Sequence, residues 1–139
     1  MTIKTVTLQL NTKGDAQVID ITSAVAKAIS DSNIESGIVT LFVPGSTAGL
    51  TTIEYESGAI GDFQRLFDEI ADPSRHYAHN ARWGDGNGHS HVRSALLGPS
   101  LTVPFTDSSL LLGTWQQIIL VDFDNRPRSR RVVVQIMGE

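Results

Sequence analysis

The chain has 139 residues, no cysteine and a net charge of −4 at neutral pH. That length predicts one domain, residues 1–139, with its own hydrophobic core. The lack of cysteine excludes disulfides, thiolate metal ligands and cysteine nucleophiles. The acidic balance argues against a nucleic-acid partner, which needs a basic surface. With no run of about 18 apolar residues and no signal-peptide core at the N-terminus, we expect no membrane partner and a cytoplasmic location.

The N-terminal half predicts strands interrupted by two helices. Alternation of polar and apolar residues, or short apolar runs, predict strands over 5–10, 17–21, 38–43 and 50–56. A first helix follows Thr22 or Ser23, with its apolar residues on one face. The second helix, 60–71, has the clearer pattern, since Phe63, Leu66, Phe67 and Ile70 recur at helical spacing and Pro73 follows its end.

The C-terminal half predicts mostly sheet after a polar segment over 74–89. A short element runs through 95–97, and strands are expected over 100–104, 109–112, 115–123 and 131–137. Residues 118–121 are apolar on both faces, so this strand should be central and covered on both sides. The chain is therefore expected to be α+β, with about eight or nine strands.

All four histidines lie between His76 and His91, around a Gly-rich segment over 83–93. On an extended backbone His89 and His91 would project to one face and could hold one metal ion. His79 could supply a third ligand, and three protein ligands with an open position are typical of catalytic zinc. The nearby carboxylate of Asp85 could carry a proton or form a hydrogen bond that supports one of the metal ligands. The alternative is a flexible surface loop in which the histidines are merely solvated.

Several residues outside this segment are candidates for anion binding. Ser46 and Thr47 follow a strand between glycines and could present hydroxyls and N–H groups to phosphate, or simply form a turn. Arg93 shares the segment with the histidines, which makes it the stronger arginine candidate. Arg131 is the most plausible substrate ligand among the C-terminal arginines, whose alternative is a solvated hairpin tip.

Two further sites each allow two interpretations. Glu54 interrupts a β-like segment, so it is either a metal ligand or general base, or part of a solvated edge strand. Thr114, Trp115 and Gln116 open the central strand. They form either the wall of a pocket or a plug at the end of the core.

The motifs together resemble the YjbQ family, often labelled a secondary thiamine-phosphate synthase family. The resemblance rests on Ser46-Thr47-Ala48 leading to Glu54, on 77–79, 91–93 and 96–100, on 113–118, and on 130–132. It covers roughly the last three-quarters of the chain. It implies a β-sandwich-like α+β fold of mixed sheets with two or three short helices, usually as a homotrimer. It also implies a pocket near the subunit interface, lined by the histidines, Glu54 and the Trp115-Gln116 segment.

The resemblance further implies weak thiamine-phosphate synthase activity. That reaction joins a pyrimidine-methyl diphosphate to a thiazole phosphate and releases pyrophosphate, and it asks for anion-binding groups and a divalent cation, Zn²⁺ or Mg²⁺. In the resulting hypothesis His79, His89, His91 and Glu54 hold the metal, and Glu54, Asp85 and His91 are the catalytic candidates. Substrate would contact Ser46, Thr47, Arg93, Thr114, Trp115, Gln116 and Arg131.

One departure from the family pattern affects the metal. Many relatives carry histidine where this chain has Gly45, and many lack His89, which could replace the lost ligand. Two rival hypotheses remain open beside the enzyme. One is a trimeric, non-enzymatic protein that binds a small anion or metabolite. In the other, the histidines stabilise a subunit interface.

Overall fold

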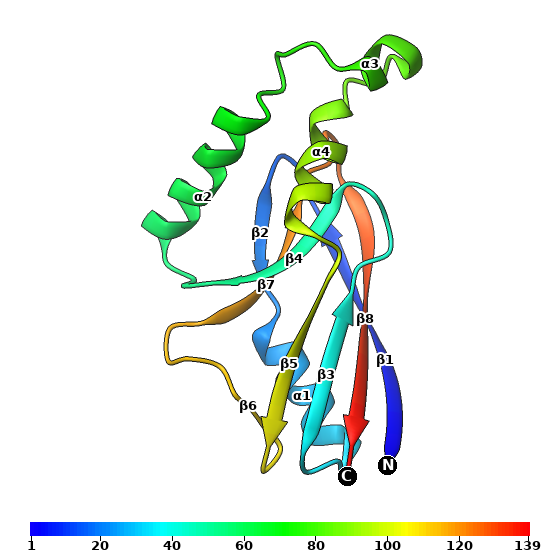
Figure 1. Cartoon of the computed structure of the whole chain (residues 1–139), viewed down its shortest axis with the longest axis vertical. Helices are drawn as coiled ribbons and strands as arrows, with labels where there is room; N and C mark the ends of the chain where they lie inside the picture. Colours follow the sequence, from blue (N-terminus) through cyan, green and yellow to red (C-terminus); the bar gives the residue numbers. More distant parts are fainter.

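The computed structural model describes all residues 1–139 and has eight strands in two antiparallel sheets with four helices (Figure 1). The larger sheet has the order β1-β8-β3-β5-β6 and the smaller one β2-β7-β4. The strands are β1 (Thr2–Thr12), β2 (Gln17–Asp20), β3 (Gly37–Phe42), β4 (Ala48–Ile53), β5 (Ser100–Thr106), β6 (Ser109–Leu110), β7 (Gln117–Asp122) and β8 (Arg128–Gly138). The helices are α1 (Thr22–Ser32), α2 (Ser57–Ile70), α3 (Ala78–Trp83) and α4 (Gly88–Leu97).

The predicted α+β class and strand number are confirmed, with two differences. Every strand pair is antiparallel, so the sheets are not mixed. Four helices form because the polar segment expected to be largely irregular contains α3 and the start of α4.

One core lies between the two sheets and α1. Alternating residues of β3, β5 and β8 point inward and meet the inner residues of β4 and β7, and α1 adds its apolar face. Val39, Leu41 and Val134 have no exposed surface. Burial of each such side chain stabilises the fold by about 1.5–3 kcal/mol.

Strand β7 is the centre of the smaller sheet and is covered on both faces, as its apolar run predicts. Ile118 and Leu120 belong to the core between the sheets, whereas Ile119 and Val121 pack on the opposite side beneath α2. The strand begins at Gln117, two residues later than expected, because Trp115 lies in the preceding turn and is 73% exposed.

Helix α2 begins at Ser57, earlier than its apolar pattern predicts. The carboxylate of Glu56 accepts hydrogen bonds from the backbone N–H groups of Gly58 and Ala59, at 2.7 and 2.8 Å. These bonds satisfy two of the backbone N–H groups that a helix N-terminus leaves without partners. The preceding strand ends at Ile53. Phe67 is the buried residue of α2 and packs on Phe123 with ring centroids 4.7 Å apart.

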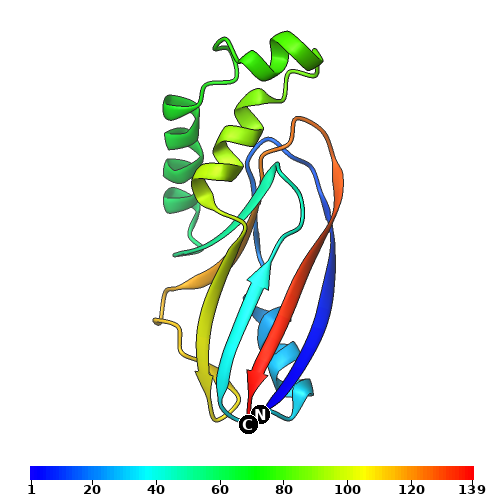
Figure 2. The same ribbon diagram turned by 45° about the vertical axis from the view of Figure 1, so that its right-hand side comes forward.

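The polar segments expected to carry function converge at one end of the molecule. Helix α3, the N-terminus of α4 and the β3–β4 and β7–β8 connections lie together at the top of Figure 1, and α2 stands beside α4 in Figure 2. The chain termini lie together at the opposite end (Figure 1). No helix is long and apolar enough to cross a membrane.

Candidate functional site

The Gly-rich segment is not an extended loop: residues 84–87 form a tight connection between α3 and α4, and residues 88–93 belong to α4. Gly84 ends α3 with φ of 65°, a conformation that glycine adopts without strain. Gly88 starts α4 so close to Tyr77 that an added Cβ would lie 2.5 Å from the Tyr77 Cβ. The backbone N–H of Gly88 donates to Asn80 Oδ1 at 2.8 Å, which fixes the two helices to each other.

Because α4 is helical from Gly88 onward, His89 and His91 point in different directions. The expectation of an extended H-x-H pair is therefore wrong, since residues two apart lie on different faces of a helix. His89 is only 5% exposed and lies near Tyr77. Burial, reinforced by the charge of Arg93, lowers the pKa of His89. His89 lines neither cavity that Gly45 lines, so it does not replace a histidine missing there.

A second group of histidines does converge. His79, Asp85 and His91 each offer a ligand atom, and these atoms lie within 4.8 Å of one another. The two imidazole rings are 4.4 Å apart between centroids. The sequence hypothesis therefore holds for His79 and His91 as neighbours, with Asp85 directly beside them.

The orientation of His91 is fixed by the β3–β4 connection. Its Nδ1 lies 3.1 Å from the carbonyl oxygen of Ser46. A carbonyl can only accept, so Nδ1 carries the proton and Nε2 keeps a free lone pair. Metal-binding histidines commonly donate their other ring N–H to a backbone carbonyl in this way.

His79 supplies the atom that points most directly to an ion. Its Nδ1 is buried and makes no hydrogen bond, although Asp85 Oδ1 lies only 3.3 Å away. Two ligands bound about 2.0–2.2 Å from one tetrahedral ion are about 3.3–3.6 Å apart. Two imidazole nitrogens and one carboxylate also suit zinc and related transition metals better than magnesium, which prefers oxygen. The residues present therefore fit a divalent transition metal.

A polar cavity of about 440 Å³ opens beside His91 and Asp85. No apolar side chain lines it. Its walls come from the three connections at this end of the molecule, from α4 and from the start of β8: Gly45, Ser46, Thr47, Asp85, Asn87, His91, Asp124, Arg128, Ser129 and Arg130. A small polar ligand fits such a space better than an apolar one.

Two arginines of β8 present unpaired donors to this cavity. Arg130 binds both carboxylate oxygens of Asp122 through Nε and Nη2, at 2.7 and 3.0 Å. Its Nη1 makes no hydrogen bond within the chain and lies 3.0 Å from where a Cβ of Gly45 would sit. Arg128 uses only Nε, which donates to Asp124 at 3.0 Å. The remaining guanidinium nitrogens are free for an anion.

A buried network holds these arginines in place. The Thr47 hydroxyl accepts from Arg130 Nη2 at 2.6 Å and donates to Asp124 Oδ2 at 2.9 Å. Burial alone would raise the pKa of Asp124, but hydrogen bonds from Thr47, Asn87 and Arg128 outweigh it and lower that pKa. Thr47 and Ser46, both predicted to bind substrate, line the cavity, but the hydroxyl of Thr47 is already engaged in the network.

The arginine candidates from the sequence lie elsewhere. Arg93 is 3% exposed, donates to the backbone carbonyl of Ala71 and pairs with Asp68 at 3.0 Å, so it anchors the end of α2. Arg131 points to the outer face of β8, opposite to Arg130, because neighbouring strand residues alternate. Neither residue lines the polar cavity.

Glu54, Thr114, Trp115 and Gln116 form a separate group at the far end of β4. Gln116 Nε2 donates to the Thr52 hydroxyl at 3.0 Å, and Glu54 follows the strand two residues later. A strand advances about 3.3 Å per residue, so Glu54 lies about 20 Å along the chain from Ala48. Within one chain these residues do not meet the histidines.

Among the C-terminal arginines the sequence favoured Arg131, whereas Arg128 and Arg130 line the cavity, and sequence reasoning missed Asp122 and Asp124 altogether. One signal for Arg130 was present: it occupies the same inward register as Val132, Val134 and Ile136. A charged residue at an inward strand position requires a buried partner. Asp122, at the end of the apolar strand β7, is that partner.

Comparison with known proteins identifies the family. A family model described as "UPF0047 protein YjbQ-like" matches residues 6–139. The chain belongs to the YjbQ family. The match extends over nearly the whole chain, further than the three-quarters suggested by the motifs.

Relatives within the YjbQ family match along their full length. A UPF0047 protein of Methanothermobacter thermautotrophicus is 37% identical, over 100% of this chain and 95% of that protein. UPF0047 protein YugU of Bacillus subtilis is 35% identical, over 95% and 98% of the two chains. Their names assign no activity, so membership in the YjbQ family establishes the fold and ancestry but no reaction.

Solved structures agree with this architecture. A YjbQ-like protein of unknown function from Sulfolobus solfataricus superimposes with a TM-score of 0.89 at 32% identity, covering 99% of this chain and 100% of that one. A hypothetical protein from Aeropyrum pernix gives a TM-score of 0.90 at 30% identity, covering 98% and 99%. The two sheets and four helices are therefore a shared YjbQ-like fold.

Proposed function

We propose that His79, Asp85 and His91 bind a divalent metal ion and that the adjoining polar cavity binds a phosphorylated small molecule. The unbonded, buried Nδ1 of His79 beside Asp85 is the observation that carries the metal assignment. Once bound, such a cation stabilises negative charge that develops on a departing phosphate. Zinc fits the donor set better than magnesium does.

The charges around the cavity support an anionic ligand. Arg128 and Arg130 offer free guanidinium N–H groups, and Ser46 and Ser129 add hydroxyls to the same wall. The carboxylates of Asp122 and Asp124 are already engaged by these arginines. A divalent cation on Asp85 would leave the wall with an excess of positive charge, so cation and phosphate should favour each other's binding.

The reaction that this arrangement supports is the one implied by the family resemblance. A pyrimidine-methyl diphosphate is joined to a thiazole phosphate, and pyrophosphate leaves. Arg128 and Arg130 would hold the diphosphate and stabilise the charge it gains on leaving. Their anchoring by Asp122 and Asp124 fixes the donors before substrate arrives, which lowers the cost of orienting them.

A non-enzymatic binding protein is the second candidate. It is favoured because the cavity has no carboxylate that is free to act as a general base. Asp85 is assigned to the metal, and Asp124 is buried with a lowered pKa, so neither is free to accept a proton. Glu54 is the remaining acid of the hypothesis, and it lies at the other end of β4. An enzyme that uses Glu54 with His91 needs a neighbouring copy to supply it, in agreement with the expected homotrimer.

Turnover and ligand affinity, measured together, separate the two functions. Thiamine-phosphate formation and pyrophosphate affinity should be measured on the zinc-loaded protein and on Glu54→Gln, with Glu69→Gln on α2 as an exposed control. For an enzyme, Glu54→Gln abolishes turnover and leaves affinity within about twofold, and Glu69→Gln changes neither. Affinity without turnover in the unmodified protein identifies a binding protein. If pyrophosphate does not bind even with zinc present, the phosphate assignment is wrong.

A further inference from the structure

The polar cavity beside His91 adjoins a second, smaller polar cavity. The smaller cavity has a volume of about 270 Å³ and is lined by Asp85, Asn87, Asn125, Arg126 and Arg128. Asp85, Asn87 and Arg128 line the larger cavity as well, so Arg128 stands at the boundary between the two spaces. No apolar side chain lines either cavity. The polar space around the proposed metal therefore continues past Arg128 to Arg126.

The side chain of Arg126 has no partner within the chain. Its backbone N–H donates to Asp124 Oδ1 at 3.2 Å, but its guanidinium makes no hydrogen bond or ion pair. Arg128 uses only Nε, which donates to Asp124 Oδ2 at 3.0 Å, so both of its terminal nitrogens are free. The smaller cavity thus has two arginines with unused donors on its wall.

The connection that carries Arg126 is held in place and is not the solvated hairpin tip considered from the sequence. Asn125 Nδ2 donates to the carbonyl oxygen of Asp85 at 2.8 Å, and the backbone N–H of Asn125 donates to Asn87 Oδ1 at 3.2 Å. Pro127 further restricts the backbone. Because these contacts position Arg126 beside the cavity before a ligand arrives, less conformational entropy is lost on binding.

The charges of the smaller cavity favour an anion. Asp85 supplies the only carboxylate among its lining residues. That carboxylate accepts from the backbone N–H of Asn87 at 3.1 Å, lies 3.3 Å from His79 Nδ1 and is assigned to the metal. Arg126 and Arg128 therefore leave an excess of positive charge. Guanidinium groups bind phosphate oxygens through paired N–H donors, so phosphate suits this wall.

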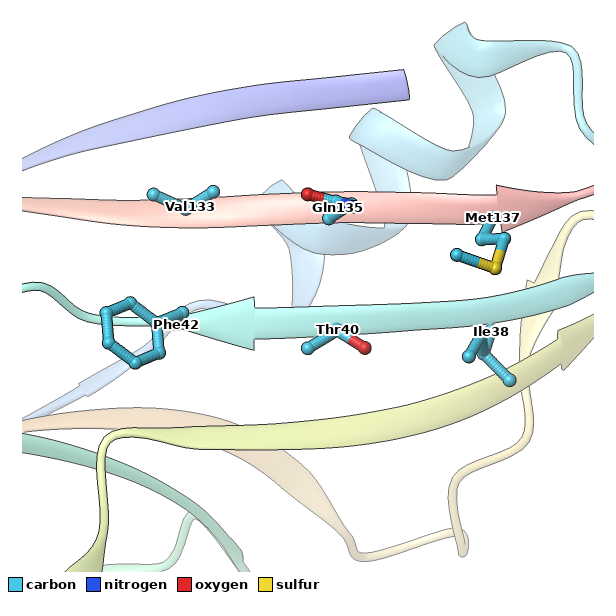
Figure 3. Close-up of a pocket in the computed structure, with 6 residues that line it drawn as sticks. All are labelled: Ile38, Thr40, Phe42, Val133, Gln135 and Met137. Atoms are coloured by element: carbon cyan, nitrogen blue, oxygen red, sulfur yellow. The ribbon is translucent and has the colours of Figure 1, made fainter. Parts of the chain in front are cut away.

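The other cavities of the molecule lack arginine donors. The groove over β3 and β8, of about 210 Å³, is bordered only by uncharged side chains, as Figure 3 shows: Ile38, Thr40, Phe42, Val133, Gln135 and Met137. The cavity beside Ala95 and Pro99 contains neither arginine nor lysine. At the chain termini, the Met1 ammonium pairs with Glu139 at 3.6 Å. Arginine-lined cavities therefore occur only next to the proposed metal site.

We propose that the smaller cavity is a second phosphate site, in which Arg126 and Arg128 hold a phosphate monoester while the larger cavity holds a diphosphate. The inference rests on the proposed function, which supplies the metal and the first phosphate site. The smaller volume, about 270 against 440 Å³, suits the smaller anion. Arg128 contacts both anions, because it borders both cavities and has two free terminal nitrogens. Two phosphorylated compounds are thereby held side by side, as a reaction that joins them requires.

Counting bound inorganic phosphate tests the second site. Equilibrium dialysis of the zinc-loaded full chain should give two phosphates per chain for the unmodified protein and one for Arg126→Gln. Loss of the guanidinium should weaken the second site at least about tenfold and leave the other dissociation constant within about twofold. Arg131→Gln is the matched control, because it removes the same charge from an exposed position that lines neither cavity, and it should bind two.

The count separates failure of this inference from failure of the proposed function. If the unmodified protein and Arg126→Gln bind the same number of phosphates, whether one or two, Arg126 forms no second site and the inference is overturned, while the larger cavity keeps its assignment. If none of the three proteins binds phosphate, both are wrong.

Pyrophosphate affinity shows whether the two sites are separate. Arg126→Gln should bind pyrophosphate within about twofold of the unmodified protein, because pyrophosphate occupies the larger cavity. A loss of about tenfold or more would show that one diphosphate spans both cavities and would contradict a separate site for a phosphate monoester.

Discussion

The Nδ1 of His91 donates to the carbonyl oxygen of Ser46 at 3.1 Å, and this contact joins α4 to the β3–β4 connection. It fixes the imidazole tautomer and leaves Nε2 as the free ring nitrogen. The two residues are far apart in sequence, so the ligand arrangement depends on the packing of α4 against β4. The Ser94 hydroxyl, which donates to the Ala48 carbonyl at 2.6 Å, strengthens the same contact.

Arg130→Gln should lower the free energy of unfolding by more than an exposed substitution does. It leaves Asp122 buried with half of its partners gone, and breaking a buried ion pair costs about 3–5 kcal/mol. Chemical denaturation measures the change. Arg131→Gln, one residue along and exposed, is the control and should change the free energy of unfolding by less than about 0.5 kcal/mol. Equal effects from both substitutions would contradict the network.

The lowered pKa of His89 should make stability fall on mild acidification. The folded pKa lies below the unfolded value, so this stabilising contribution is present above about pH 6.5 and is lost as pH falls through the folded pKa. Free energies of unfolding between pH 8 and pH 5, with a chelator present, should show this slope. His89→Gln should reduce it, and an identical slope in both proteins would show that His89 does not contribute.

Mixing two inactive variants should restore activity if the site crosses a subunit boundary. His91→Ala removes a metal ligand, and Glu54→Gln removes the distant carboxylate. Mixed assemblies would contain some sites with both groups intact, so part of the turnover should return. Recovery is expected only after subunits exchange, which partial denaturation and refolding together ensures. If activity stays at zero in exchanged mixtures, while each variant mixed with unmodified protein remains active, the shared site is excluded.

The sheet elements were predictable because their patterns are local. Residues 118–121 are apolar on both faces, and that property alone predicts a covered central strand, which β7 is. Helix α2 was likewise predictable from the helical spacing of its apolar residues. Its early start was not, because it depends on the cap formed by Glu56 rather than on apolar residues.

The helical state of 88–97 was harder to predict because tertiary contacts hold it. Glycine, serine and histidine have low helix propensity, and the buried hydroxyl of Ser90 instead donates to the carbonyl of Phe123, far along the chain. Because residues 88–97 are helical, His91 lies beside His79, whereas His89 is buried apart from them. The expectation that all three histidines share one site therefore fails for His89. The same dependence on distant partners explains why Arg93 anchors α2 while Arg130 faces the cavity.

The amount of zinc bound per chain tests the central claim most directly. Isothermal titration and metal analysis should be carried out on the unmodified protein, His79→Ala, His91→Ala and the exposed control His76→Ala. We predict one zinc ion per chain in the unmodified protein and in His76→Ala, and at least about 100-fold weaker binding in the other two. Near-zero zinc in all four proteins, or unchanged affinity in His79→Ala and His91→Ala, would contradict a metal site at His79, Asp85 and His91.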